Sequence, residues 1–210
     1  MYECLGTNTC RLTVQSSGQP YRYRGRAGAH GDSSGQPHSR QAIDIGSFAS
    51  LSLSLSLDID NHWLTCLVAQ NSAIGAAGAV HIAQLIASNS CGLRKIHISD
   101  NAIGLDGIKP IADALASNTT LRTLGCARNH LGDAGARLLA RALRANATLT
   151  ALGVGGNSFT GQGVQAFINT LSENKTLVKI GVVAPSREFD LQLELNKRLS
   201  RNAQLAQQHQ

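Results

Sequence analysis

A repeat of about 28 residues constrains this chain more than any other feature of its sequence. Five similar lines begin at Leu64, Leu93, Leu121, Leu149 and Leu177; the first is 29 residues long and the next three are 28. Self-similarity at this spacing is the signature of a solenoid, in which each unit buries its apolar side against its neighbours. The sequence therefore predicts one small unit stacked about five times.

Each line combines two hydrophobic periods. Positions 1, 4 and 6, such as Leu93, Ile96 and Ile98, alternate as in a short strand, whereas later positions, including Leu139 and Leu143, follow helical spacing. A helix is about 10 Å wide and neighbouring strands lie about 4.8 Å apart, so stacked strand–helix units must curve. We therefore predict an α/β horseshoe with parallel strands on the concave side and helices on the convex side.

The lines share the pattern LxxLxLxxNxIGxxGxxxLAxxLxxN. Position 9 is Asn101, Asn129 or Asn157 in the three central lines, but Ser72 in the first and Pro185 in the last. This pattern resembles leucine-rich repeats of the ribonuclease-inhibitor-like class over about two-thirds of the chain. In that family the position-9 asparagine forms an internal ladder, so the resemblance implies that these three amides satisfy backbone groups at a turn.

Asparagine fills a second column, position 26, at the end of each helical stretch: Asn89, Asn118, Asn146, Asn174 and Asn202. Three of the five begin an Asn-X-Thr triplet, the acceptor for N-glycosylation. The other two keep the asparagine without the triplet, as a structural column would. We therefore predict helix stops rather than sugar sites, with asparagine tolerating the left-handed conformation that often ends a helix.

Composition divides the chain before the repeats. Residues 1–50 are rich in Gly, Ser, Gln and Arg, and we predict a disordered low-complexity tail. Residues 51–63 include the alternating LSLSLSLDI, which predicts a strand capping the first repeat; the alternative is low-complexity drift. The repeat lines are 64–92, 93–120, 121–148, 149–176 and 177–204, with the last as a C-terminal cap.

No catalytic, cofactor or metal site is predicted. The glycine-rich stretch 153–161 lacks the Gly-Lys-Ser/Thr ending of a phosphate loop, and the five cysteines lack the spacing of a disulfide framework. Cys4, Cys10, His30 and His38 lack the close pairing of a zinc site. Cys126 falls on a core strand position, and Cys66 is expected to be an ordinary thiol.

Strand positions 2, 3, 5, 7 and 8 should face the concavity. The ionisable residues at these positions are Arg94, Lys95, His97, Asp100, Arg122, Arg128 and Lys179. We predict that Arg94, Lys95, Arg122 and Arg128 form a basic cluster beside Asp100, next to a shallow floor of glycines. The hypothesis is that this cluster binds an acidic patch on a partner protein; the alternative is a solvated face.

These features favour a non-enzymatic, monomeric protein-interaction module in the cytoplasm, with a nuclear or secreted effector role left open. Repeats of this class also occur in NOD-like receptors, bacterial effectors and the GTPase-activating protein of Ran, so a GTPase regulator is the alternative. A nucleic-acid role through the Arg/Gly segment 21–28 ranks lower. We expect no membrane insertion, because no apolar run approaches the roughly 20 residues needed.

Overall fold

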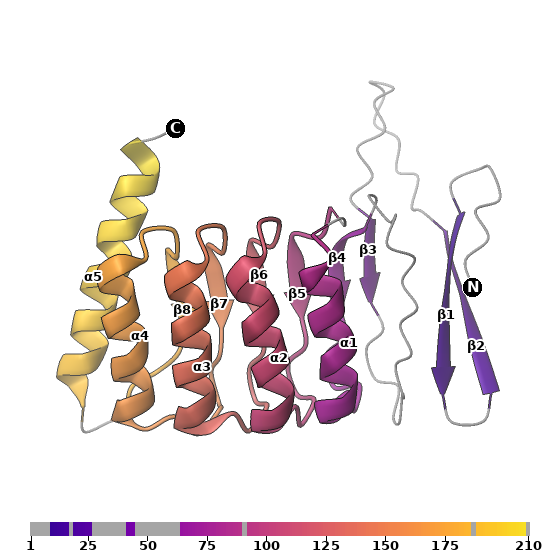
Figure 1. The fold of residues 1–210 in the computed structure, drawn as a ribbon, viewed down its shortest axis with the longest axis horizontal. Coiled ribbons are helices and arrows are strands. Elements are labelled where there is room, and N and C mark those ends of the chain that lie inside the picture. The colour runs from indigo at the N-terminus through magenta and orange to yellow at the C-terminus, as the bar shows by residue number, and fades with distance from the viewer. Residues whose placement is uncertain are drawn as a thin grey trace.

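The chain folds into a strand–helix solenoid, as the repeat predicts. The computed structural model describes residues 9–16, 19–26, 41–44, 64–89, 92–185 and 188–208. Six parallel strands form one sheet in the order β3-β4-β5-β6-β7-β8, and from β4 onward strands and helices alternate. Figure 1 shows the helices side by side as one layer along the sheet.

The repeated strands are β4 (Leu64–Val68), β5 (Lys95–His97), β6 (Thr123–Gly125), β7 (Ala151–Gly153) and β8 (Lys179–Gly181). The helices are α1 (Gly75–Ala87), α2 (Gly104–Ser117), α3 (Gly132–Ala145), α4 (Gly161–Glu173) and α5 (Phe189–Gln208).

The repeat period sets the strand register. Leu67 pairs with Ile96, which pairs with Leu124, then Leu152 and then Ile180, so equivalent positions stand beside each other across the sheet. The first four of these side chains are buried between the sheet and the helix layer. Because strand side chains alternate between faces, the residues on either side of this apolar column point away from the core.

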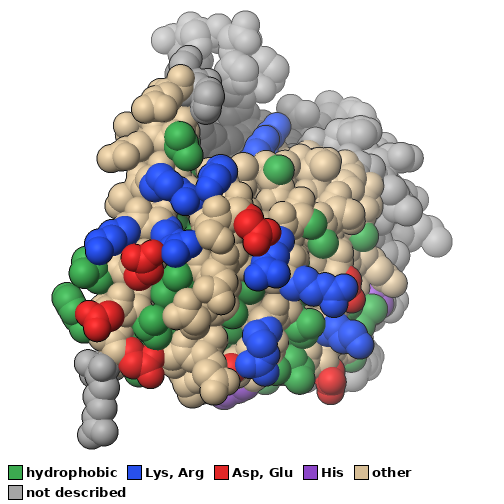
Figure 2. All heavy atoms as spheres, turned by 60° about the vertical axis from the view of Figure 1, so that its left-hand side comes forward, with side chains coloured by type: hydrophobic (Ala, Val, Ile, Leu, Met, Phe, Trp, Pro, Cys, Tyr) green, Lys and Arg blue, Asp and Glu red, His purple; other side chains and the backbone are tan. Residues whose placement is uncertain are grey.

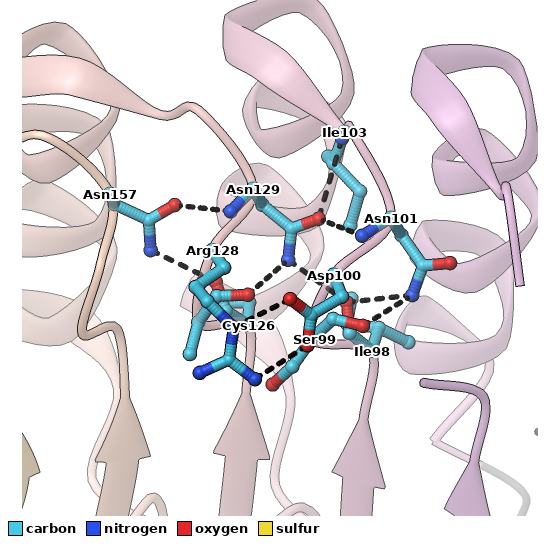
Figure 3. Close-up of polar contacts among 10 residues, drawn as sticks. Ile98, Ser99, Asp100, Asn101, Ile103, Cys126, Arg128, Asn129 and Asn157 are labelled. Atoms are coloured by element: carbon cyan, nitrogen blue, oxygen red, sulfur yellow. Dashed lines mark hydrogen bonds and ion pairs between the residues drawn. The ribbon is translucent and has the colours of Figure 1, made fainter. Parts of the chain in front are cut away.

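The position-9 asparagines are buried and bonded to backbone at the turn after each strand (Figure 3). The Asn129 amide nitrogen donates to the carbonyls of Ile98 at 2.9 Å and Ala127 at 3.1 Å. Its side-chain oxygen accepts from the N–H of Asn101 at 2.8 Å. The oxygen of Asn157 accepts in turn from the N–H of Asn129 at 2.7 Å. Each amide thus joins its own repeat to the one before it.

Four of the position-26 asparagines, Asn118, Asn146, Asn174 and Asn202, are buried and form a second ladder, which for the first three lies at the C-terminal ends of the helices. The Asn146 side-chain nitrogen donates to the carbonyls of Leu115 at 2.7 Å and Asn118 at 2.9 Å, and its oxygen accepts from the N–H of Leu149 at 2.7 Å. Asn174 repeats this arrangement one unit later. Both amide hydrogens are used, so the folded chain presents no free acceptor nitrogen for a glycan at these positions.

The helix stop with left-handed backbone predicted for this column was wrong at four of the five positions, since Asn202 lies inside α5 and three others are extended. Asn118, Asn146 and Asn174 are extended, with φ between −69° and −82°. Only Asn89 is left-handed, with φ of 48°. The cause is the ladder itself, because an extended backbone turns the side chain inward, where it accepts from the N–H groups that start the next strand.

Helices pack closely because position 15 is glycine. A side chain at Gly107 would place its Cβ 2.9 Å from the Cβ of Ala79 and 3.0 Å from the Cα of Ala76, both on the neighbouring helix. Ordinary carbon contacts are about 3.5–4.0 Å, so the two helices approach only because this position lacks a side chain.

The N-terminal edge of the sheet is covered by a strand from the segment before residue 50. β3 (Gln41–Asp44) pairs with β4, and β1 (Thr9–Ser16) pairs with β2 (Gln19–Arg26) as an antiparallel hairpin. These three strands lie within the tail for which we predicted disorder; the rest of 1–50 is outside the described residues. The capping strand predicted at 51–63 is also outside them.

The C-terminal line forms the predicted helix over a longer range than expected. α5 begins at Phe189, buries Leu195 and Asn202, and continues to Gln208. The Asn202 side-chain nitrogen donates to the carbonyls of Asn174 and Leu177, both at 2.9 Å, which closes the second ladder. Figure 1 shows the end of α5 projecting past the other helices.

We expect Asn129→Ala to lower the free energy of unfolding by about 3 kcal/mol, because it leaves buried backbone groups of two repeats unsatisfied. Urea unfolding followed by circular dichroism measures this loss. Asn169→Ala on the exposed face of α4 is the control and should change stability by less than about 0.5 kcal/mol. Equal losses in the two variants would contradict the structural role of the ladder.

Candidate interaction surface

The sheet places two columns of residues side by side on its concave face. Lys95 of β5 is paired with Thr123, which is followed by Ala151 and then Lys179 of β8. The second column carries His97, Gly125, Gly153 and Gly181 in the same order. The face therefore carries long polar side chains at β5 and Lys179 at β8, with Thr123, Ala151 and three glycines at the facing positions between and beside them.

Three cations gather at the start of β5 and β6. Arg94, Lys95 and Arg122 are all exposed, and none forms an ion pair with any described residue. The Arg122 guanidinium instead donates to the backbone carbonyl of Thr148 at 3.1 Å. Strands lie about 4.8 Å apart, so these charges share one small area whose positive charge is not neutralised. We call Arg94, Lys95 and Arg122 the concave cluster.

Arg128 does not add a free charge to this cluster. Its Nε lies 2.5 Å from Oδ1 of Asp100 and its Nη2 lies 2.6 Å from Oδ2, a bidentate pair visible in Figure 3. Both residues have left-handed backbone, with φ of 60° and 51°, at equivalent turn positions of adjacent repeats. The hydrogen bond from Arg128 holds the pKa of Asp100 below its usual range and raises that of the arginine.

Lys179 lies too far along the sheet to join the concave cluster. It stands on β8 and Lys95 on β5, three strand spacings or about 14 Å away. The half-buried His97 ring lies over the glycine beside it, because a Cβ added at Gly125 would come 2.6 Å from its Nδ1. The predicted site residues therefore divide into one compact cluster, one ion pair, a histidine and a separate lysine.

Two cysteines occupy different environments. Cys126 is fully buried in the core, and burial raises the pKa of its thiol to about 12. Cys66 is half-buried on β4. The side chains of Cys4, Cys10, His30 and His38, which were considered as zinc ligands, lie outside the described residues. In the segments that the structure describes, no helix is long and apolar enough to cross a membrane.

A second basic surface lies on the helices, outside the strand positions from which the candidate site was predicted. α3 exposes Arg137, Arg141 and Arg144, spaced four and three residues apart, and α2 exposes Lys109 at the position equivalent to Arg137. Figure 2 shows Lys and Arg side chains grouped on this side of the molecule. The signal was present in the sequence as the ARLLARALRA stretch, whose arginines fall on one helical face.

A family model described as leucine-rich repeat matches residues 89–112, 117–140 and 145–167, that is, the central repeats. The fold is a leucine-rich-repeat solenoid. The match falls on both asparagine ladders but does not assign the ribonuclease-inhibitor-like class. A comparison with curated protein sequences gave no match.

Solved structures share this fold at low sequence identity. Leiomodin-1 actin-binding site 2 is 23% identical, with a TM-score of 0.59 over 67% of this chain and 81% of that one. The tropomodulin C-terminal domain of Caenorhabditis elegans is 16% identical, with a TM-score of 0.55 over 65% and 85%. At these identities the likeness establishes the solenoid alone.

We expect Arg128→Gln to raise the pKa of Asp100, because the carboxylate loses the hydrogen bonds that favour its charged form. NMR titration of the Asp100 carboxyl carbon measures the shift. A folded-state pKa below the unfolded one means that the pair stabilises the fold above the unfolded pKa and that this contribution is lost as the pH falls through the folded pKa. An unchanged Asp100 titration would show that the ion pair does not persist in solution.

We expect Cys126 to be inert toward thiol reagents in the folded protein and to react once urea unfolds it. A variant in which the other four cysteines are serine isolates its signal, and absorbance with a disulfide reagent at pH 8 follows the reaction. Restoring Cys66 alone gives the control, a half-buried thiol that should react in the native state. Rapid native labelling of Cys126 would contradict its burial.

Proposed function

We propose that the chain is a non-enzymatic protein-interaction module whose concave face binds an acidic surface of a partner protein. The observation that carries the proposal is the concave cluster, in which Arg94, Lys95 and Arg122 are exposed and form no ion pair among the described residues. Like charges held this close repel, and an acidic partner would relieve the repulsion while gaining charge-assisted hydrogen bonds.

The neighbouring groups support a protein partner with a compact acidic patch. The Arg128–Asp100 pair lies in the turns that follow β5 and β6, and its charges already satisfy each other, so Arg128 is not a free charge for a partner. Gly125, Gly153 and Gly181 stand side by side at one facing position of β6, β7 and β8, which lets a partner backbone come close to the sheet along this column. Guanidiniums fit carboxylates bidentately, which favours acidic side chains.

Actin is the first partner to test. The leiomodin-1 structure that shares this fold is actin-binding site 2 of that protein, and the chain covers 81% of it. Neither matched structure supports the alternative of a GTPase activator. The proposal also includes that the repeats belong to the ribonuclease-inhibitor-like class and that the protein is a monomer located in the cytoplasm.

The test compares the full-length protein with Arg94→Glu/Arg122→Glu in co-sedimentation with filamentous actin and in capture of monomeric actin. We expect the double variant to bind about tenfold or more weakly, because two attractive charges become repulsive. Lys175→Glu/Lys197→Glu is the matched control, since both lysines are exposed and the net charge changes equally.

If the wild-type chain binds actin and the two double variants bind equally well, the concave cluster is not the interface. If the wild-type chain does not bind actin, actin is excluded, and the same pair of variants is compared on proteins captured from host lysate. Capture that is lost only with the concave variant supports the proposal with another partner. Circular dichroism of each variant establishes that it is folded.

A further inference from the structure

The helical face opposite the concave cluster carries a separate concentration of positive charge. Arg137, Arg141 and Arg144 form an exposed row along α3, and Lys109 extends it onto α2. The same columns on α1 hold Val80 and other uncharged residues. Among α1 to α4 the exposed Lys and Arg side chains are therefore concentrated on α2 and α3, and α5 carries a separate group that includes Lys197. We call Lys109, Arg137, Arg141 and Arg144 the helical basic face.

This row is held at a cost to helix stability. Like charges three and four residues apart on a helix destabilise it by roughly 0.2–0.5 kcal/mol per pair. The acidic residue one turn before Arg137 is Asp133, but its carboxylate accepts from the backbone N–H of Thr160 at 2.8 Å and from its hydroxyl at 2.5 Å. The hydroxyl bond is the main cause that lowers the pKa of Asp133, and the charge of nearby Arg137 lowers it further, so the carboxylate serves the start of α4 first and Arg137 second.

No described residue compensates the rest of the row by a direct ion pair. The two ion pairs among the described residues are Arg128–Asp100 and Arg198–Glu194, and both lie elsewhere. Asp113 stands on α2 at the position equivalent to Arg141 and is the one acidic residue in these columns. The face therefore keeps a net positive charge that is open to a ligand.

A groove adjoins the Arg137 end of the basic row and runs along α4. It has a volume of about 670 Å³, and its lining includes Arg137, Gln165, Asn169 and Glu188. Its polar wall combines amides of α4 with Glu188, whose Oε2 is buried and accepts no hydrogen bond from a described residue, so the groove suits backbone N–H groups rather than the carboxylates of a ligand. Gln165 donates to Asn169 at 2.8 Å, which leaves each amide with further donors or acceptors. Amides of this kind can pair with both the N–H and the C=O groups of a peptide backbone.

We propose that the helical basic face and this groove together bind an acidic segment of a partner protein. Carboxylates of the segment pair with Arg137, Arg141 and Arg144, and its backbone continues into the amide-lined groove. This site is on the opposite side of the solenoid from the concave cluster and is independent of it. The solenoid would then engage acidic protein surfaces on two faces.

Nucleic acid and membrane fit this surface less well. Single-stranded nucleic acid is commonly bound by aromatic stacking, and the two aromatic residues of α4 and its approach, Phe159 and Phe167, pack against each other at 5.9 Å in the core. Membrane-surface helices insert large apolar side chains beside their basic ones, whereas the row on α3 exposes arginines alone. An acidic peptide needs only charge and backbone pairing, and both are offered.

The test measures binding of the full-length protein to a fluorescein-labelled 12-residue peptide of alternating Glu and Ser, by fluorescence anisotropy at low salt. We expect Arg137→Gln/Arg141→Gln/Arg144→Gln to weaken binding at least about tenfold and Gln165→Ala/Asn169→Ala to weaken it by a smaller factor. The control is Lys175→Gln/Lys197→Gln, because both lysines are exposed and lie outside the two basic surfaces, and it should keep binding. The concave variant Arg94→Gln/Arg122→Gln is compared beside it to separate any peptide bound at the concave cluster.

The thermal midpoint of the triple variant provides a second readout, because removing like charges should leave it unchanged or raise it. Peptide binding that survives the triple variant, or that is lost only in the concave variant, overturns the proposal. Tighter binding of a 12-nucleotide single-stranded RNA or of phosphatidylserine vesicles through the same arginines also overturns it, in favour of those ligands. Failure of the concave test with actin leaves these outcomes unaffected.

Discussion

The buried asparagine ladders are the interaction on which the rest of this solenoid depends. Each repeat has two places where the chain leaves regular structure, after the strand and after the helix, and backbone groups there would otherwise be buried without partners. Asn129 and its equivalents satisfy the first turn, and Asn146 and its equivalents the second. Every amide also bonds to the preceding repeat, so the ladders fix both the shape of one unit and its spacing from the next.

Because the ladders and the apolar column fix the backbone, the outward positions are free to differ. The interior repeats closely: Ile96, Leu124 and Leu152 hold equivalent buried sites. The surface does not, since Lys95 and Ala151 share a column, as do Val80 and Arg137. Function in such a molecule is therefore expected in the non-repeating positions, and both proposed interfaces consist of them.

The repeat period alone predicts the architecture, because a 28-residue spacing of strand and helix patterns has one compact solution. It does not predict side-chain pairing at turns: Arg128 was expected to join the basic cluster, but left-handed turns bring it to Asp100. The left-handed backbone predicted for Asn118 was also wrong, because its side chain caps the turn from an extended backbone. In both cases local propensity was overridden by hydrogen bonds between repeats, which a single line of sequence does not contain. The repeat pattern does not extend to residues 41–44, so it did not predict the strand β3 at the edge of the sheet.

The two basic surfaces differ in geometry, and this difference argues for different ligands. Charges of the concave cluster come from adjacent strands about 4.8 Å apart, so they form a compact group that a folded acidic patch could match. Those of the helical basic face run along one helix, where Arg137 and Arg144 are separated by seven residues at 1.5 Å each, or about 10 Å. An extended chain spans that length in about three residues, and the groove beside α4 continues its path. Both faces belong to the same ladder-joined repeats, so a folded acidic patch and an extended acidic segment would approach the solenoid from opposite sides.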